Sequence, residues 1–185
     1  MPTIVVKATA EISRDGKTIT FTETTGAYSG SNTSGYGMPN LDITDFIRAD
    51  LTVTPPSGVP TTYNILASGF PSATNGTYDI VSATPFADGI YTFFYEIEDN
   101  TGDIYDVTVI VGFYYNITVC IYKKICKLKL EDCNCDCSND LLAHIAQMYI
   151  YFEKLKIEAA FGRVDAFNET LVVLQRMCAY EPCNC

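Results

Sequence analysis

The chain has 185 residues, of which 48% are apolar and 18% charged, and its formal net charge is −10. This composition is that of a folded protein, and the length suits one large or two small domains. The negative charge argues against direct nucleic-acid binding, which draws its affinity from Lys and Arg. No apolar run approaches the ~18 residues of a membrane-spanning helix, and no secretory signal is visible at the start, so we expect a soluble protein without a membrane partner.

The charge is unevenly distributed along the chain. Residues 1–113 hold four basic and thirteen acidic side chains, whereas residues 114–185 hold eight and nine. This asymmetry predicts two domains with a boundary near residue 113. The basic side chains of the second domain include a short run that we interpret as the solvated face of a helix or strand: Lys123, Lys124, Lys127 and Lys129.

The first domain consists of β-rich runs separated by turn residues. Asp15-Gly16 has the residue types that accept positive φ in a two-residue hairpin turn, which would place Ile12 opposite Ile19. Six or seven short strands predict an antiparallel β-sandwich of immunoglobulin-like type. The expected strands are Ile4–Ser13, Lys17–Glu23, Asp50–Thr54, Thr61–Ala67, Gly76–Val81, Gly89–Asp99 and Asp103–Val111.

The longest of these runs, Gly89–Asp99, alternates between two kinds of side chain. Because successive side chains of a strand point to opposite faces, one face should be apolar and the other more polar. The apolar face would carry Tyr91, Phe93, Tyr95 and Ile97, and the other Thr92, Phe94, Glu96 and Glu98.

A long segment rich in Gly, Ser and Thr, residues 24–40, interrupts the strands. Loops longer than ~12 to 15 residues without structure of their own are usually functional or disordered. We expect Tyr28, Tyr36 and Met38 either to anchor this loop against a neighbouring subunit, as an oligomer contact loop, or to cover the loop's own core.

The second domain is expected to be helical. Between Tyr114 and Leu130 the signals conflict, and we predict a strand that ends near Ile117 followed by a helix to Leu130. Two further helices separated by Phe161-Gly162-Arg163 should pair as an antiparallel hairpin. Their apolar seams would be Leu141, Ile145, Met148, Phe152, Leu155 and Ala159 in the first, and Val164, Phe167, Leu171, Leu174 and Cys178 in the second.

Two cysteine clusters flank this predicted hairpin, and antiparallel pairing would bring them to the same end. Disulfides in an oxidising setting, a closed zinc site of four thiolates, and reduced packing thiols are three alternatives for them. Cys120 and Cys126 stand apart and are interpreted as core thiols or as partners of an odd cysteine in the clusters. The six clustered cysteines are Cys133, Cys135, Cys137, Cys178, Cys183 and Cys185.

Signs of catalysis are sparse. His144 is the only histidine, and no Ser or Cys motif surrounds it, so a structural place on its helix is favoured over a catalytic base. A minor hypothesis makes His144 a metal ligand beside Cys137. We therefore predict a non-enzymatic protein without a cofactor, with zinc held by the cysteine cluster as the alternative.

A loose series of motifs is followed in the chain by a sandwich and then by cysteine-flanked helices. The motifs are Thr18-Ile19-Thr20, Thr24-Thr25-Gly26-Ala27-Tyr28 and Gly35-Tyr36-Gly37-Met38-Pro39-Asn40. This order of features resembles the small structural proteins of crAss-like bacteriophages of gut Bacteroidales, in particular the ring or collar proteins that stack below the portal in short-tailed virions.

This resemblance implies a virion protein, assembled in the host cytoplasm, that forms a homo-oligomeric ring and contacts the portal or an adjacent tail ring. A sandwich and a cysteine-linked helical hairpin offer two rigid surfaces, and the loop offers an adaptable arm. Such surfaces would suit the heterologous contacts between subunits that close a ring. The alternative from the residues alone is a surface-exposed or secreted binding module for a carbohydrate or protein partner, held by disulfides.

Overall fold

The computed structural model of the protein describes residues 6–24, 46–72, 76–130 and 138–180. It divides the chain into two compact units. The first comprises Met1–Thr84 and Tyr91–Ile110, and the second comprises Pro85–Ile90 and Val111–Cys185. The helical unit therefore includes a short segment, Pro85–Ile90, that precedes the predicted domain boundary near residue 113.

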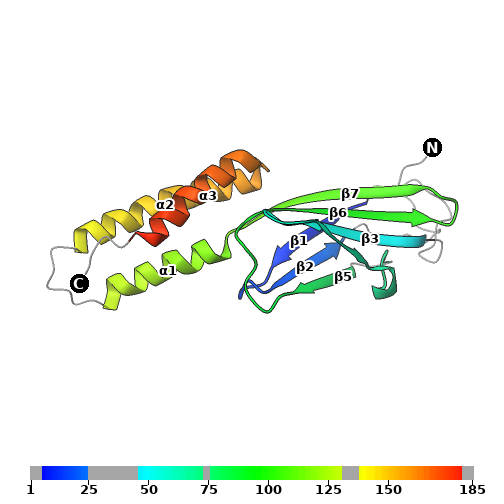
Figure 1. The fold of residues 1–185 in the computed structure, drawn as a ribbon, viewed down its shortest axis with the longest axis horizontal. Coiled ribbons are helices and arrows are strands. Elements are labelled where there is room, and N and C mark those ends of the chain that lie inside the picture. The colour runs from blue at the N-terminus through cyan, green and yellow to red at the C-terminus, as the bar shows by residue number, and fades with distance from the viewer. Residues whose placement is uncertain (1–5, 25–45, 73–75, 131–137, 181–185) are drawn as a thin grey trace. The chain divides into compact units, whose positions relative to one another are not determined.

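The described residues form two antiparallel sheets and three C-terminal helices (Figure 1). The three-stranded sheet has the order β1-β2-β5, and the four-stranded sheet has the order β4-β3-β6-β7. The strands are β1 (Ala8–Ile12), β2 (Thr18–Glu23), β3 (Phe46–Thr54), β4 (Thr61–Asn64), β5 (Gly76–Val81), β6 (Gly89–Asp99) and β7 (Ile104–Phe113). The helices are a short 3-10 turn η2 (Leu66–Ser68), then α1 (Tyr115–Leu130), α2 (Ser138–Ala160) and α3 (Val164–Ala179).

The first hairpin has the predicted register, but its turn is not the predicted two-residue one, because the Gly16 amide donates a hydrogen bond to the Ser13 carbonyl oxygen at 2.9 Å and the turn spans Ser13 to Gly16. Gly16 has a φ of 72°, and the Asp15 carboxylate accepts a hydrogen bond from the Lys17 amide at 3.1 Å. Glycine adopts this positive φ without steric cost, which is why it stands at this position. Ile12 pairs with Ile19 as expected.

Aromatic side chains fill the space between the two sheets. The rings of Phe21 from β2 and Tyr95 from β6 have centroids 5.3 Å apart, and Phe70 packs against both. The alternation predicted for β6 is confirmed, because Tyr91, Phe93, Tyr95 and Ile97 are buried while the side chains between them are partly exposed.

The outer face of the four-stranded sheet carries an ionic cluster that links β3 to β6. The Arg48 guanidinium lies 2.9 Å from the Glu98 carboxylate and 3.1 Å from that of Asp50, and it also pairs with Glu96. The acidic residues of this region thus neutralise an arginine on the same sheet. β3 begins at Phe46, four residues before the predicted start, and β4 ends at Asn64, where η2 follows.

In the second unit, α2 and α3 run antiparallel through a turn at Gly162, whose φ is 62° (Figure 1). The predicted seams are largely confirmed, since Met148, Leu155, Phe167 and Leu174 are fully buried in one core. Val164 was predicted on the seam, but it is 39% exposed because it is the first residue of α3, where the chain has only just left the turn.

The prediction of a strand as far as Ile117 is wrong. β7 ends at Phe113, and α1 begins at Tyr115. The Asp88 carboxylate accepts hydrogen bonds from the backbone amides of Asn116 and Ile117, both at 2.8 Å, and so satisfies donors that a helix start leaves unpaired. Ile117 and Ile121 then pack into the core formed by α2 and α3.

Within the described part of the chain, no helix combines the length and apolar character that crossing a membrane would require.

Candidate functional site

Most of the site residues expected from the sequence lie outside the described residues. This holds for the loop side chains Tyr28, Tyr36 and Met38 and for five of the clustered cysteines, namely Cys133, Cys135, Cys137, Cys183 and Cys185. The sixth, Cys178, is described.

Cys178 on α3 forms a disulfide with Cys120 on α1, with their Cα atoms 6.1 Å apart and a sequence separation of 58. This pairing corresponds to the alternative in which Cys120 is the partner of a clustered cysteine. The bond joins the first and last helices of the unit. Cys126 is a free thiol, and its hydrogen bond with Tyr122 raises the pKa of that phenol.

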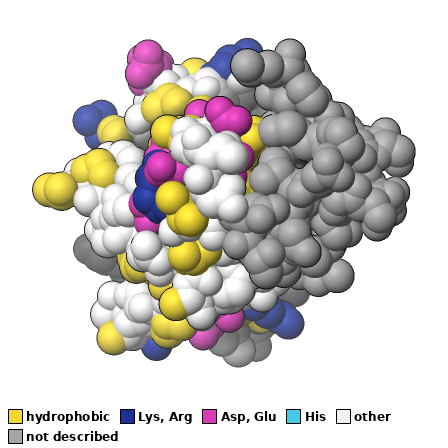
Figure 2. All heavy atoms as spheres, turned by 90° about the vertical axis from the view of Figure 1, so that its right-hand side faces the viewer, with side chains coloured by type: hydrophobic (Ala, Val, Ile, Leu, Met, Phe, Trp, Pro, Cys, Tyr) yellow, Lys and Arg dark blue, Asp and Glu magenta, His cyan; other side chains and the backbone are white. Residues whose placement is uncertain are grey.

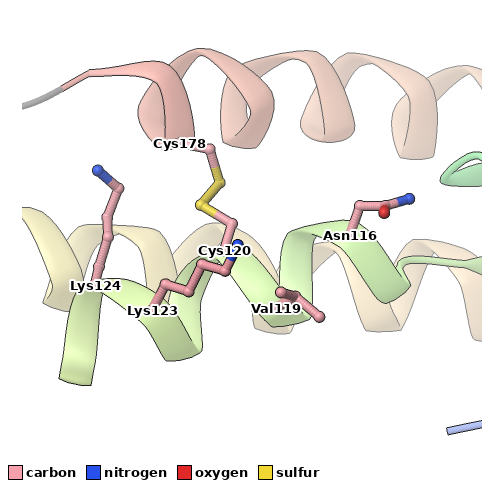
Figure 3. A pocket seen from close by; sticks show the side chains of 6 residues that line it. All are labelled: Asn116, Val119, Cys120, Lys123, Lys124 and Cys178. Carbon is pink, nitrogen blue, oxygen red and sulfur yellow. A yellow bond between two sulfur atoms is a disulfide. The ribbon is translucent and has the colours of Figure 1, made fainter. Parts of the chain in front are cut away.

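The disulfide lies in a pocket of about 300 Å³ within the helical unit. Figure 3 shows Cys178 reaching down from α3 to Cys120, while the other labelled side chains leave neighbouring turns of α1. Two lysines give the pocket a basic character. The residues that line it are Asn116, Val119, Cys120, Lys123, Lys124 and Cys178.

The interpretation of the basic run as a solvated face is wrong for Lys124, which is buried. Only 6% of Lys124 is exposed, and its Nζ donates a hydrogen bond to the carbonyl oxygen of Tyr180 at 2.8 Å, just beyond the end of α3. A buried lysine must be paired, and the last carbonyls of a helix are suitable partners because they are otherwise unsatisfied. Lys123, the next residue, is exposed to solvent.

His144 has a structural place in this unit. Its Nε2 lies 2.9 Å from the carbonyl oxygen of Met177, and its ring lies against that of Tyr180, with centroids 5.3 Å apart. The start of α2 is thereby held to the end of α3. Among the residues that the structure describes, no group of three or more His, Cys, Asp or Glu side chains could hold a metal ion.

At the other end of α1, Asn116 belongs to both the pocket and the helix start. Its side-chain amide donates hydrogen bonds to the carbonyl oxygen of Phe86 at 3.0 Å and to the Asp88 carboxylate at 3.1 Å. Burial raises the pKa of Asp88, while the hydrogen bonds from Asn116 and Ile117 oppose that rise. Asn116 is thus held firmly at one edge of the pocket.

Sequence reasoning missed the pocket because it treated the cysteines and the lysines separately. A signal was present, since Lys123 and Lys124 follow Cys120 by three and four residues. On a helix these spacings place side chains on neighbouring positions of one face. These three residues all lay in the helix predicted after Ile117, but their shared face was not considered.

Comparisons with known proteins add little. No protein-family model and no curated protein matches this chain. A matching solved structure is chitinase ChiW from Paenibacillus sp. str. FPU-7, described as a cell-surface-expressed multi-modular enzyme, with 16% identity and a TM-score of 0.37. The match covers 60% of this chain but only 9% of the chitinase chain, and at that TM-score it supports no conclusion about fold or function.

Proposed function

We propose that this protein is a non-enzymatic structural subunit that assembles with copies of itself, and that the outward face of α2 forms the subunit contact. The observation that carries the proposal is a second apolar stripe on that helix, on the side away from the core. Its members are Leu142, Tyr149, Ile150 and Ile157, which are 54%, 44%, 63% and 49% exposed.

The spacing of these side chains makes them one surface. Leu142 and Tyr149 are seven residues apart, and so are Ile150 and Ile157, which places each pair about two turns apart on the same face of α2. From Leu142 to Ile157 the helix rises by 15 residue steps, so the stripe is roughly 22 Å long. The outward side of α2 thus carries large apolar side chains around the Glu153–Lys156 ion pair, whereas a purely solvent-exposed helix face is typically polar.

The stripe is comparable in size to apolar patches that often serve in binding. Its four side chains expose on the order of 400 Å², within the range of the largest apolar patch on a typical monomer, which is often functional. A second copy is a suitable partner despite the net charge of −10, because the stripe is locally neutral. Glu153 on the same helix is paired with Lys156 at 2.9 Å.

The resemblance to the ring or collar proteins of crAss-like phages extends this proposal to a specific assembly. The subunits would form a cyclic ring in the virion, in contact with the portal or an adjacent tail ring and assembled in the host cytoplasm. A ring closes through heterologous contacts, in which the α2 stripe of one copy meets a different surface of the next.

The strand order supports an immunoglobulin-like sandwich for the first unit. In such folds the first, second and fifth strands share one sheet, and the third, sixth and seventh share the other. β1, β2 and β5 lie together here, as do β3, β6 and β7, while β4 pairs with β3. Sandwiches of this kind often serve as rigid modules in larger assemblies.

Direct binding to nucleic acid is not part of the proposal. Figure 2 shows one face of the protein, on which basic and acidic side chains lie side by side with hydrophobic side chains scattered among them. Phosphate backbones are bound by clusters of Lys and Arg, which that face does not offer among the described residues.

Native mass spectrometry of the purified chain, with negative-stain electron microscopy, tests the proposal. We expect uniform cyclic oligomers for the natural sequence and monomers for the Ile150→Glu variant, because burying an unpaired charge in an apolar contact is costly. Gln147→Glu is the matched control, since it adds the same charge at another exposed position of α2 outside the stripe.

Two outcomes would contradict the proposal. A natural chain that stays monomeric at high concentration would contradict self-assembly. Oligomers that persist in Ile150→Glu, or that disappear equally in Gln147→Glu, would show that the stripe is not the contact.

A second candidate function is a surface-exposed or secreted binding module for a carbohydrate or protein partner. The Cys120–Cys178 disulfide favours it, because disulfides persist mainly in oxidising compartments. Binding of the monomeric chain to a glycan array would support this function, and a cyclic oligomer without glycan binding would favour the ring.

A further inference from the structure

We propose that the pocket beside the Cys120–Cys178 disulfide binds a small anionic thiol, and that the bound thiolate reduces the disulfide while the helical unit stays folded. The disulfide would then be a reversible latch between α1 and α3. This inference concerns the helical unit alone and does not depend on the function proposed above.

The first observation is access to the sulfur atoms. Both cysteines line the pocket, and both are half-buried rather than enclosed in the core. A volume of about 300 Å³ is at the small end of ligand pockets, which suits a low-molecular-weight thiol better than a protein reductant.

The second observation is charge. The chain carries a net charge of −10, yet the pocket is lined by Lys123 and Lys124. Lys124 is held in place by its hydrogen bond to the Tyr180 carbonyl oxygen, and it extends from α1 toward α3 in Figure 3. Positive charge draws an anionic thiol into a cleft and stabilises thiolates, both the attacking one and the one that leaves.

The chemistry is thiol–disulfide exchange. The thiolate sulfur of the first small thiol attacks one Sγ, the Sγ–Sγ bond breaks, and the other cysteine leaves as a thiolate. A second small thiol then attacks the mixed disulfide and releases the first cysteine. Two electrons and two protons pass to the protein, which gains two thiols, and the two small thiols are oxidised to their own disulfide.

Reduction would open the latch without dissolving the helical core. Ile117 and Ile121 of α1 pack with Leu171 and Leu174 of α3 in the same buried cluster, independently of the sulfur bond. The latch would therefore be open in a thiol-rich compartment such as a cytosol and closed after exposure to an oxidising exterior.

Reduction rates of the full chain in native buffer test this inference. The probes are glutathione as the anionic thiol, 2-mercaptoethanol as the neutral one and cysteamine as the cationic one. Alkylation and mass spectrometry would give each rate, and division by the same thiol's rate toward a small-molecule disulfide removes its intrinsic reactivity. We expect the normalised rate of glutathione to exceed that of cysteamine about tenfold, and salt at 0.5 M to remove most of the difference.

The Lys123→Gln variant should lose several-fold of the preference for glutathione. Lys154→Gln should retain it, because Lys154 is an exposed lysine of α2 that does not line the pocket. Circular dichroism would check that each variant is folded. Equal normalised rates for the three thiols, an unchanged preference in Lys123→Gln, or reduction only at denaturant concentrations that unfold the helices would each overturn the inference.

Discussion

The carboxylate of Asp88 accepts a hydrogen bond from the backbone amide of Ile117 at 2.8 Å, across 29 residues of sequence. The same carboxylate accepts one from the Asn116 amide, so a segment that precedes β6 caps the helix that follows β7. The β6–β7 hairpin thus begins and ends in the helical unit. The Asp88 side chain therefore caps the start of α1, just after the end of β7.

Replacement of Asp88 by Ala should destabilise α1. Loss of a capping carboxylate costs about 1 to 2 kcal/mol, and we expect a decrease of that size in the free energy of unfolding of the helical unit. Hydrogen exchange of the Asn116 and Ile117 amides should become faster in the same variant. Asp88→Asn keeps one acceptor oxygen and should therefore lose less stability than Asp88→Ala. Unchanged hydrogen exchange of the two amides in Asp88→Ala would show that the cap contributes nothing.

The parts of the fold that could be predicted from the sequence are those set by local signals, and the Asp88 cap is not one of them. The pairing of Ile12 with Ile19, the two faces of β6 and the seam of α2 depend on local periodicity and turn chemistry, and the structure confirms them. The start of α1 depends on a carboxylate that is distant in the sequence, and the aromatic and β-branched residues around it favour a strand locally. Local signals could not reveal that tertiary contact.

The candidate site was harder to predict for the same reason. Spacing indicated that the cysteines would cluster, but it could not select Cys120 as the partner of Cys178, because that pairing requires α1 to pack beside α3. Lys124 was interpreted as solvated because lysine is rarely buried, and its hydrogen bond to the Tyr180 carbonyl oxygen is a tertiary contact that favours its burial.

Asp99 should make the first unit sensitive to acid. Burial alone would raise its pKa, but hydrogen bonds from Thr101, Asp103 and Tyr105 outweigh burial and lower the pKa below the ordinary value of 3.8. A carboxylate with a depressed folded-state pKa contributes stability that is present above its unfolded pKa and is lost as the pH falls through the folded value.

We therefore expect Asp99→Asn to destabilise the first unit by about 1 kcal/mol at pH 7, as the loss of charge-assisted hydrogen bonds predicts. The difference from the natural chain should shrink as the pH falls below about 4. Urea unfolding of the natural chain and of Asp99→Asn between pH 2 and pH 7 measures this difference in the free energy of unfolding. A difference that stays constant across this range would contradict a role for the ionised carboxylate.

Gly112 is a position where the helical unit has no room for a side chain. An added Cβ would lie 2.7 Å from the Cβ of Ala159 and 2.8 Å from Cε2 of Phe167. Gly112→Ala should therefore lower stability by about 1 to 3 kcal/mol, the usual cost of overpacking. Thermal unfolding of the single variants and of the Gly112→Ala, Ala159→Gly double variant provides the check, since relief of one clash should make the double variant more stable than the sum of the single effects. Strict additivity would show that the two positions are not in contact.

The covalent link between α1 and α3 should have a measurable effect on stability. Cross-linking a loop of 58 residues lowers the entropy of the unfolded chain, which for this length corresponds to about 4 kcal/mol. We expect the Cys120→Ser, Cys178→Ser double variant to lose roughly that much in urea unfolding of the helical unit while keeping its helical circular dichroism, because the cluster around Met148 and Leu155 remains buried. The natural chain under reducing conditions should show the same loss, whereas the double variant should be unaffected by reductant. If reductant lowers the stability of the double variant as much as that of the natural chain, other cysteines, and not the Cys120–Cys178 bond, are the source of the effect.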